Sequence, residues 1–211
     1  MGYIAKSPIP SARQNPQFRI TFKKPEVHAP SKKTIEKAIA AATGKTRLMM
    51  LLQRWSGIAI SDAIFFKRNR LEGNLVRGNR RKTKERFRIR IPHELAQALR
   101  ALPCDEPDYF FVDGGRDQVR YWQREYRLTF KAAKVKMSSH LFRHFRITEL
   151  LASGVRVEDV ASMVGTSPQE IRKTYQHWIK EAEDRLDDVQ RKEWLSQGLD
   201  ENGNERTGIL Q

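Results

Sequence analysis

The sequence has little cysteine and no long apolar run. Cys104 is the single cysteine among 211 residues, which excludes an intrachain disulfide framework and is typical of the reducing cytoplasm. No stretch approaches the roughly 18 apolar residues of a membrane-spanning helix. The N-terminal segment also lacks the apolar run of a secretory signal peptide. We therefore expect a cytoplasmic protein that uses Cys104 for packing and has no membrane partner.

Acidic residues are scarce beside basic ones. Asp and Glu number 25 against 40 Lys and Arg, so the formal net charge is +15. An excess of this size favours a polyanionic partner, with nucleic acid ahead of an anionic membrane. Hydrophobic residues still make up 39% of the chain and recur in periodic runs, so a hydrophobic core is possible.

Three segments differ in composition. Residues 1–30 contain five prolines and apolar residues without a period, which predicts a basic extended arm or linker. Residues 31–195 carry the periodic apolar pattern of one folded domain. Residues 196–211 are typical of a flexible C-terminal tail.

Helical patterns in the folded segment flank a short region of alternating residues. "NLVRG" and "RFRIRI" predict an antiparallel hairpin with the basic loop "NRRKTKE", and "DYFFVDGG" predicts a further strand and turn. Apolar spacings of three and four predict three helices before the hairpin and five or six from Pro92 onward, the last of them starting behind Ser167. The expected fold is mixed α+β, mainly α-helical with a small antiparallel β-sheet.

The sequence contains no metal-site or nucleotide-site motif. His140 and His144 are four residues apart, but Leu141 stands where a zinc-protease helix has Glu. "TGKT" at residues 43–46 lacks the upstream glycine of a phosphate-binding loop and follows a helix instead of a strand. We therefore expect no metal, no nucleotide and no other cofactor.

The predicted hairpin is strongly basic. Residues 67–90 contain eleven Lys or Arg and two Glu. Such charge can protect the exposed edge of a sheet, but an excess this one-sided favours contact with the phosphates of a duplex. The residues that we expect to bind DNA are Lys67, Arg68, Arg77, Arg80, Arg81, Lys84, Arg86 and Arg88.

A second cluster begins the stretch "HLFRHFRITELLASG". His140 and Arg143 share one helix face. Arg143 can hold two phosphate oxygens in its planar fork, and His140 can donate a hydrogen bond or move a proton. Tyr175 follows on a later helix, where its hydroxyl can attack phosphorus or its ring can simply pack. His144 is expected to support this cluster, and Arg146 to make a surface or backbone contact.

The order of these motifs resembles the catalytic domain of the tyrosine recombinase, or phage integrase, family. That family has His-x-x-Arg-His, an apolar helix ended by Gly, Leu-Gly-His-Ser, and a Tyr ten residues after that Gly. This chain has "HLFRH", "LLASGV" and "MVGTS", with Tyr175 ten residues after Gly165. "RWSGIAISDAIFFKRNRL" and "NRRKTKERFRIRIP" resemble the family's first-arginine segment and lysine hairpin, and the whole match spans about residues 31 to 180.

The resemblance implies a site-specific recombinase that cleaves and rejoins double-stranded DNA through a 3′-phosphotyrosyl intermediate, as in the integration of mobile elements. Tyr175 would be the nucleophile, Arg143 and His140 would bind the scissile phosphate, and Lys82 would protonate the leaving 5′ oxygen, with Lys84 and Arg81 as near alternatives. The family also implies a homo-oligomer on DNA and a nucleoid-associated location. An apolar stripe on the last helix (Trp178, Leu186, Val189 and Trp194) suits docking on a neighbour or on its own domain.

Two positions depart from the family pattern. Ala59 stands at the first catalytic arginine, and Thr166 stands at the second His or Trp. Losing one charge from a phosphoryl-transfer site costs roughly 10³-fold in rate, and the substitutes nearest in sequence are Arg54, Lys67 and Arg68. The domain is therefore a compensated enzyme, a catalytically degenerate DNA-binding protein, or an enzyme altered at Ala59 to stall the reaction. A topoisomerase IB-like activity is a more distant alternative.

The family usually carries a core-binding domain before the catalytic one. Only some thirty arm-like residues precede this domain. The resemblance therefore predicts either a catalytic fragment or a short form that grips DNA from one side.

Overall fold

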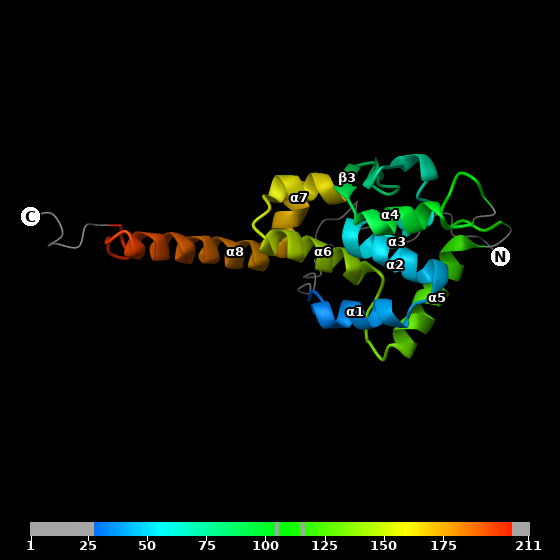
Figure 1. The fold of residues 1–211 in the computed structure, drawn as a ribbon, viewed down its shortest axis with the longest axis horizontal. Helices are drawn as coiled ribbons and strands as arrows, with labels where there is room; N and C mark the ends of the chain where they lie inside the picture. Colours follow the sequence, from blue (N-terminus) through cyan, green and yellow to red (C-terminus); the bar gives the residue numbers. More distant parts are fainter. Residues whose placement is uncertain (1–27, 104–105, 115–116, 204–211) are drawn as a thin grey trace, which may run out of the picture.

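The computed structural model describes residues 28–103, 106–114 and 117–203. Most of the predicted arm (1–27), Cys104 and the end of the predicted tail (204–211) lie outside this part. The described residues form eight α-helices, one short 3₁₀ helix and a three-stranded antiparallel sheet, which confirms the predicted fold class (Figure 1). The elements are α1 (Lys32–Ala41), α2 (Gly44–Ser56), α3 (Ile60–Ile64), η2 (Arg68–Arg70), β1 (Leu71–Glu72), β2 (Leu75–Asn79), β3 (Arg86–Arg90), α4 (His93–Arg100), α5 (Gln118–Ala132), α6 (His140–Ala152), α7 (Val157–Val164) and α8 (Pro168–Ser196).

Helix α2 lies at the centre of the core. It ends at Gly57, which takes the left-handed conformation (φ 67°) that glycine adopts without strain. Gln53 on α2 accepts a 2.6 Å hydrogen bond from the buried hydroxyl of Tyr126 on α5, and its amide donates to the carbonyl of Ile58. Buried polar groups need such partners, so this network sets how α5 crosses α2.

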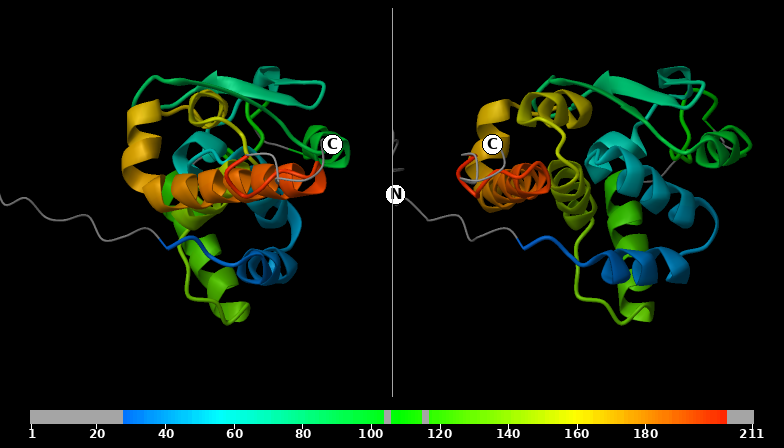
Figure 2. Two further views of the ribbon diagram at one scale, coloured as in Figure 1. Left: turned by 90° about the vertical axis from the view of Figure 1, so that its left-hand side faces the viewer. Right: turned by 60° about the vertical axis from the view of Figure 1, so that its left-hand side comes forward.

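The sheet lies over one side of the helices (Figure 2). Strand β3 alternates as predicted: Phe87 and Ile89 are buried, and three arginines point outward. Gly78 pairs with Phe87, and a Cβ at Gly78 would lie 2.7 Å from the Phe87 ring. The sheet therefore accepts only glycine there without a shift. Strand β1, of two residues, is too short to produce a sequence pattern and was not predicted.

The predicted strand at "DYFFVDGG" is wrong for the residues that the structure describes. Only an isolated bridge between Lys67 and Tyr109 forms there. Phe110 and Phe111 are both buried, which a strand with one solvent face does not allow. Backbone bonds from Arg68 to Asp108 and from Phe110 to Phe66 form this bridge, and the carbonyl of Phe111 accepts instead from the side chain of Trp122.

The C-terminal helices continue from the core into solvent. Helix α7 ends at Gly165 (φ 67°), and Ser167 caps α8 by accepting from the amide of Glu170. The helical segment predicted behind Ser167 is α8, which has a kink at Tyr175, where the backbone is non-helical (φ −123°, ψ 23°). Beyond it α8 projects from the body (Figure 1), and the side chains of Leu186 and Val189 are each 62% exposed.

An ion pair joins α2 to α6. Arg54, which is buried, makes a two-pronged contact with the carboxylate of Glu149, with nitrogen–oxygen distances of 2.9 and 2.6 Å. Arg146 adds a 2.7 Å bond to the same carboxylate. Burial of Glu149 opposes its ionisation, but the bonds from Arg54 and Arg146 lower its pKa overall. The three charges therefore form one network.

Glu149→Ala is expected to destabilise the domain by about 2–4 kcal/mol, because it leaves the buried Arg54 without a counter-charge. Urea unfolding followed by circular dichroism measures the change. The control is Glu181→Ala on the exposed part of α8, expected within about 0.5 kcal/mol of wild type. Equal losses in the two variants would contradict this account.

Candidate active site

A cavity of about 420 Å³ opens between the β2–β3 hairpin, α6 and the start of α8. It brings together residues that are far apart in the sequence. These include Tyr175 and the other catalytic candidates His140, Arg143, Lys82 and Thr166. Its lining includes Arg80, Lys82, Thr83 and Glu85 from the hairpin, His140, Arg143 and His144 from α6, and Thr166, Glu170 and Tyr175 from the α7–α8 region.

Arg143 is held by the C-terminal ends of two helices. Its Nη1 donates to the carbonyl of Gly57 after α2 (3.0 Å) and to that of Val164 at the end of α7 (2.7 Å). These ends carry partial negative charge. Burial, together with the nearby Arg80, lowers the pKa of Arg143 to about 10, so it stays charged at neutral pH. No hydrogen bond among the described residues uses its Nη2 or Nε, which are left for an anion.

Tyr175 sits at the break in α8, with its side chain buried. Its Oη lies 2.5 Å from Nδ1 of His144. Burial raises the pKa of the hydroxyl, so the group is protonated at neutral pH. It can donate to Nδ1 when the imidazole carries its proton on Nε2. His144 was predicted only as support, yet it contacts the candidate nucleophile directly.

His140 and His144 lie one turn apart with their rings at 4.5 Å. Burial, His140 and Arg143 lower the pKa of His144 to about 4. Desolvation and the cations Arg143 and Arg80 also lower the pKa of His140. Both imidazoles are therefore neutral at pH 7, and each can accept a hydrogen bond.

The low pKa of His144 predicts a pH-dependent stability. An unfolded histidine takes up a proton near pH 6.5, whereas the folded one does so only near 4. The unfolded state thus binds more protons between these values, and stability falls as the pH drops from 6.5 to 4. His144→Asn, which can still accept from Tyr175, is expected to flatten this fall in urea midpoints measured across the window. Parallel curves for the two proteins would contradict the assignment.

Asp62 anchors the hairpin to α3. Its buried carboxylate accepts from Nε of Arg80 (2.8 Å) and from the backbone amide of Arg81 (2.9 Å). Arg80 also donates from Nη1 to the carbonyl of Gly165 (3.2 Å). Sequence reasoning missed Asp62, although a lone acid within the apolar "AISDAIFF" was a usable signal.

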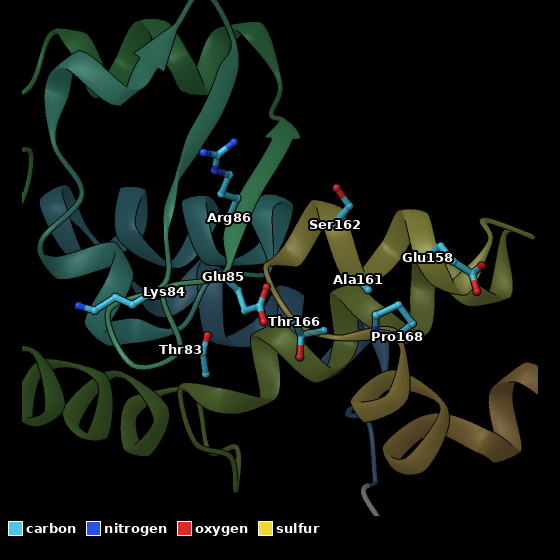
Figure 3. Close-up of a pocket in the computed structure, with 9 residues that line it drawn as sticks. All are labelled: Thr83, Lys84, Glu85, Arg86, Glu158, Ala161, Ser162, Thr166 and Pro168. Carbon is cyan, nitrogen blue, oxygen red and sulfur yellow. The ribbon is translucent and has the colours of Figure 1, made fainter.

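The structure separates the three candidates for the hairpin lysine. Lys82 lines the cavity of Arg143 and Tyr175. The guanidinium of Arg81 instead stacks on the ring of Phe65, 3.8 Å from its centroid. Lys84 (φ 61°) lines a neighbouring cavity and points away from Thr166 in Figure 3. Geometry thus favours Lys82 for the predicted role.

Thr166 lies where the two cavities meet. It lines both of them, close to Thr83 and Glu85 of the hairpin (Figure 3). Its amide donates to the carbonyl of Ala161, which closes the end of α7. The predicted position of this hydroxyl beside the site is therefore compatible with a phosphate contact.

Ala59 and its suggested substitutes do not line the cavity. Ala59 is the N-cap of α3. Arg54 is paired with Glu149, and Lys67 lies over the ring of Tyr109 at 5.5 Å. Arg68 donates to the carbonyls of Tyr109 and Leu102, which ties η2 to the following loop. None of these three cations lines the cavity, so this geometry does not favour any of them as a substitute for the first arginine.

The other predicted DNA contacts stand on the outer face of the hairpin. Arg86 and Arg88 are exposed on β3, and Arg77 on β2 pairs with Glu72. Within the described part of the chain, no three His, Cys, Asp or Glu side chains are grouped to hold a metal ion. Nor does any helix in that part have the length and apolar character needed to cross a membrane.

Solved structures show what this fold is similar to. No protein-family model matches the sequence, and neither does any curated protein. The XerA recombinase aligns over 79% of this chain and 66% of its own, at 18% identity and a TM-score of 0.62. The catalytic domain of the bacteriophage HP1 integrase aligns over 72% and 89%, at 15% identity and 0.59.

A lambda integrase fragment (residues 75–356), solved as a dimer bound to a core site, aligns over 78% of this chain and 63% of its own, at 13% identity and a TM-score of 0.59. This chain thus spans just under two thirds of the XerA and lambda structures. At these identities the likeness concerns the backbone. It confirms the fold expected from the motifs: the chain has the fold of tyrosine recombinase and integrase catalytic domains.

Proposed function

We propose that this chain is the catalytic domain of a site-specific DNA recombinase that acts through Tyr175. One observation carries the proposal: the Tyr175 hydroxyl, hydrogen-bonded to His144, opens on the same cavity as Arg143, His140 and Lys82. A buried tyrosine that only packed would need neither a break in its helix nor a cluster of cations at its hydroxyl.

The cavity residues suggest one balanced reaction. Tyr175 Oη attacks phosphorus, the Oη–P bond forms, and the bond from phosphorus to the 5′ oxygen breaks. His144 Nδ1 accepts the tyrosine proton, and Lys82 supplies a proton to the leaving 5′ oxygen. Arg143 binds the phosphate oxygens through Nη2 and Nε. Rejoining is the reverse, and because the phosphotyrosyl link conserves the phosphodiester free energy, it needs no ATP.

The charge of the incoming phosphate bears on the proton transfer. Burial, His140 and Arg143 lower the pKa of His144 in the free protein. A phosphate anion bound to Arg143 offsets that positive charge and so makes His144 a better proton acceptor. The site therefore gains basicity only when DNA is bound.

We also propose double-stranded DNA as the partner and a homo-oligomer on DNA as the working form, in the nucleoid of the cytoplasm. The exposed arginines of β3 provide a basic face beside the cavity. Among the similar structures, lambda integrase was solved as a tetramer bound to a Holliday junction and XerH bound to its difH substrate. Two members of the apolar stripe, Leu186 and Val189, are exposed on the projecting part of α8 and available to a neighbour, whereas Trp178 packs against the core.

A second candidate is a DNA-binding protein that does not cleave. It is favoured by the two departures, Ala59 and Thr166, which remove one charge and one imidazole from the family's set. The two candidates share the fold and the basic face, so only chemistry separates them.

A pool of nicked suicide duplexes with randomised sequence tests the proposal without knowledge of the target. A nick shortly 3′ of the cleaved bond makes the leaving strand a short fragment with a free 5′ hydroxyl, which diffuses away and leaves the covalent intermediate trapped. We expect an adduct that resists denaturing electrophoresis and whose DNA converges on one sequence when recovered. Salt-sensitive binding with no adduct over the whole pool would favour the non-cleaving alternative.

A further inference from the structure

We propose that Arg80 replaces the arginine that Ala59 lacks and, with Arg143, forms a two-sided clamp on the scissile phosphate. This proposal rests on the proposed function, and it assigns to the hairpin a charge that the family pattern places on α3. Arg80 was predicted only as one of several DNA contacts.

Arg80 and Arg143 are seated on consecutive carbonyls at the end of α7. Arg143 donates to Val164 (2.7 Å) and Arg80 to Gly165 (3.2 Å). Both side chains line the cavity that holds Tyr175. Two guanidinium groups thus converge on one space from α6 and from the hairpin, at the opening of the nucleophile's hydroxyl.

Each guanidinium keeps donors for a ligand. The hydrogen bonds of Arg80 use Nε, toward Asp62, and Nη1, toward Gly165. Among the residues that the structure describes, none accepts from its Nη2, just as none accepts from Nη2 or Nε of Arg143. Asp62 fixes the direction of Arg80 without engaging its third nitrogen, in the manner of a residue that holds a ligand-binding group in place.

The electrostatics of the cavity favour an anion between the two arginines. Burial is the main cause of the lowered pKa of Arg143 and of His140, and the charge of Arg80 lowers both further. Asp62 neutralises part of this charge from the far side of Arg80. A phosphate between the two guanidinium groups would replace repulsion by two attractive contacts.

Glycine at position 165 makes room for Arg80. A Cβ there would lie 2.9 Å from Cγ of Arg80 and 3.1 Å from Cβ of Phe87, and the backbone has a φ of 67°. Two other arginines of this region point elsewhere, since Arg54 pairs with Glu149 and Arg81 stacks on Phe65. Arg80, in contrast, is anchored by Asp62 of α3 and lines the cavity.

The test compares rates of adduct formation on the selected suicide duplex. Arg80→Ala is expected to slow the reaction by about 10²- to 10³-fold, as for loss of one preorganised donor. Arg80→Ala also leaves the buried carboxylate of Asp62 without its counter-charge. The double variant Asp62→Asn with Arg80→Met therefore removes both charges together. Thermal melting verifies that this variant is folded. Arg127→Ala, an exposed arginine on α5 that does not line the cavity, is the matched control and should keep the rate within about threefold.

A second measurement does not depend on cleavage. Titration with inorganic phosphate, followed by ³¹P NMR line broadening, should show binding that is lost in the Arg80 variants and kept in Arg127→Ala. If wild type forms no adduct but phosphate binding needs Arg80, the clamp stands and the recombinase function fails. Folded Arg80 variants with wild-type adduct rates, or with unchanged phosphate binding, overturn the clamp. An Ala59→Arg variant should gain little, because the charge is already supplied.

Discussion

Tyr175→Phe is expected to abolish the covalent protein–DNA adduct, a loss of at least about 10⁴-fold in its rate of formation. The substitution removes only the hydroxyl that would attack phosphorus. The ring keeps its neighbours, His144 at 5.6 Å and Trp178 at 5.8 Å between centroids, so the break in α8 should persist. The measurement is denaturing electrophoresis of the suicide reaction.

Two readouts make the Tyr175 result specific. Salt-dependent DNA binding should remain within about threefold of wild type, because no charge changes. Tyr109→Phe, whose ring contacts Phe65 and Lys67 outside the cavity, should form the adduct at the wild-type rate. An adduct that survives in Tyr175→Phe would assign the nucleophile to another residue and refute the proposed mechanism.

Arg143→Ala is expected to slow adduct formation by about 10³-fold or more, because it removes a preorganised guanidinium from the phosphate. It also leaves the carbonyls of Gly57 and Val164 without their donor. A buried acceptor that loses its partner costs about 1–3 kcal/mol, so urea unfolding should show a smaller, separate loss of stability.

Arg143→Lys divides these two effects. Lysine keeps the charge but cannot reach two carbonyls and still present a planar fork to phosphate. We expect Arg143→Lys to recover most of the stability that Arg143→Ala loses. Its rate of adduct formation should be less than a tenth of the wild-type rate. The control is Arg172→Ala. Arg172 lies on α8, is exposed and pairs with Glu158 of α7, so its loss should leave adduct formation unchanged. Equal effects of Arg143→Ala and Arg172→Ala would show that Arg143 has no role in the reaction.

The sequence was most informative where chemistry and periodicity coincide. The His-x-x-Arg pair, the interval from Gly165 to Tyr175 and the alternation in β3 were local signals, and the structure brings the first two to one cavity. The strand expected at residues 108–115 failed for a tertiary reason. Trp122 and Arg68 take the carbonyls that a neighbouring strand would have used, and no local pattern reports such side-chain partners.

Two contacts of the candidate site lay beyond sequence reasoning. The sequence does not indicate that His144, and not His140, contacts Tyr175. That contact depends on the kink in α8 at Tyr175 and on how α8 packs against α6. Asp62 and Arg80 are 18 residues apart and on different elements, so their pairing had no periodic signature. Arg54 illustrates the reverse, because it lies near Ala59 in the chain but is turned toward Glu149.

The sequence by itself determined the class of fold, the basic character of the hairpin and the order of the motifs around Tyr175, because composition and helical or strand spacing are written along the chain. Only the tertiary structure decided which cations face the cavity. The orientation of the Arg143 and Arg80 side chains depends on the carbonyls at the ends of α2 and α7 that accept their hydrogen bonds. For Arg80 it also depends on the buried Asp62. A charge lost at Ala59 can be supplied from another element because a phosphate responds to distance and geometry, and not to position in the chain.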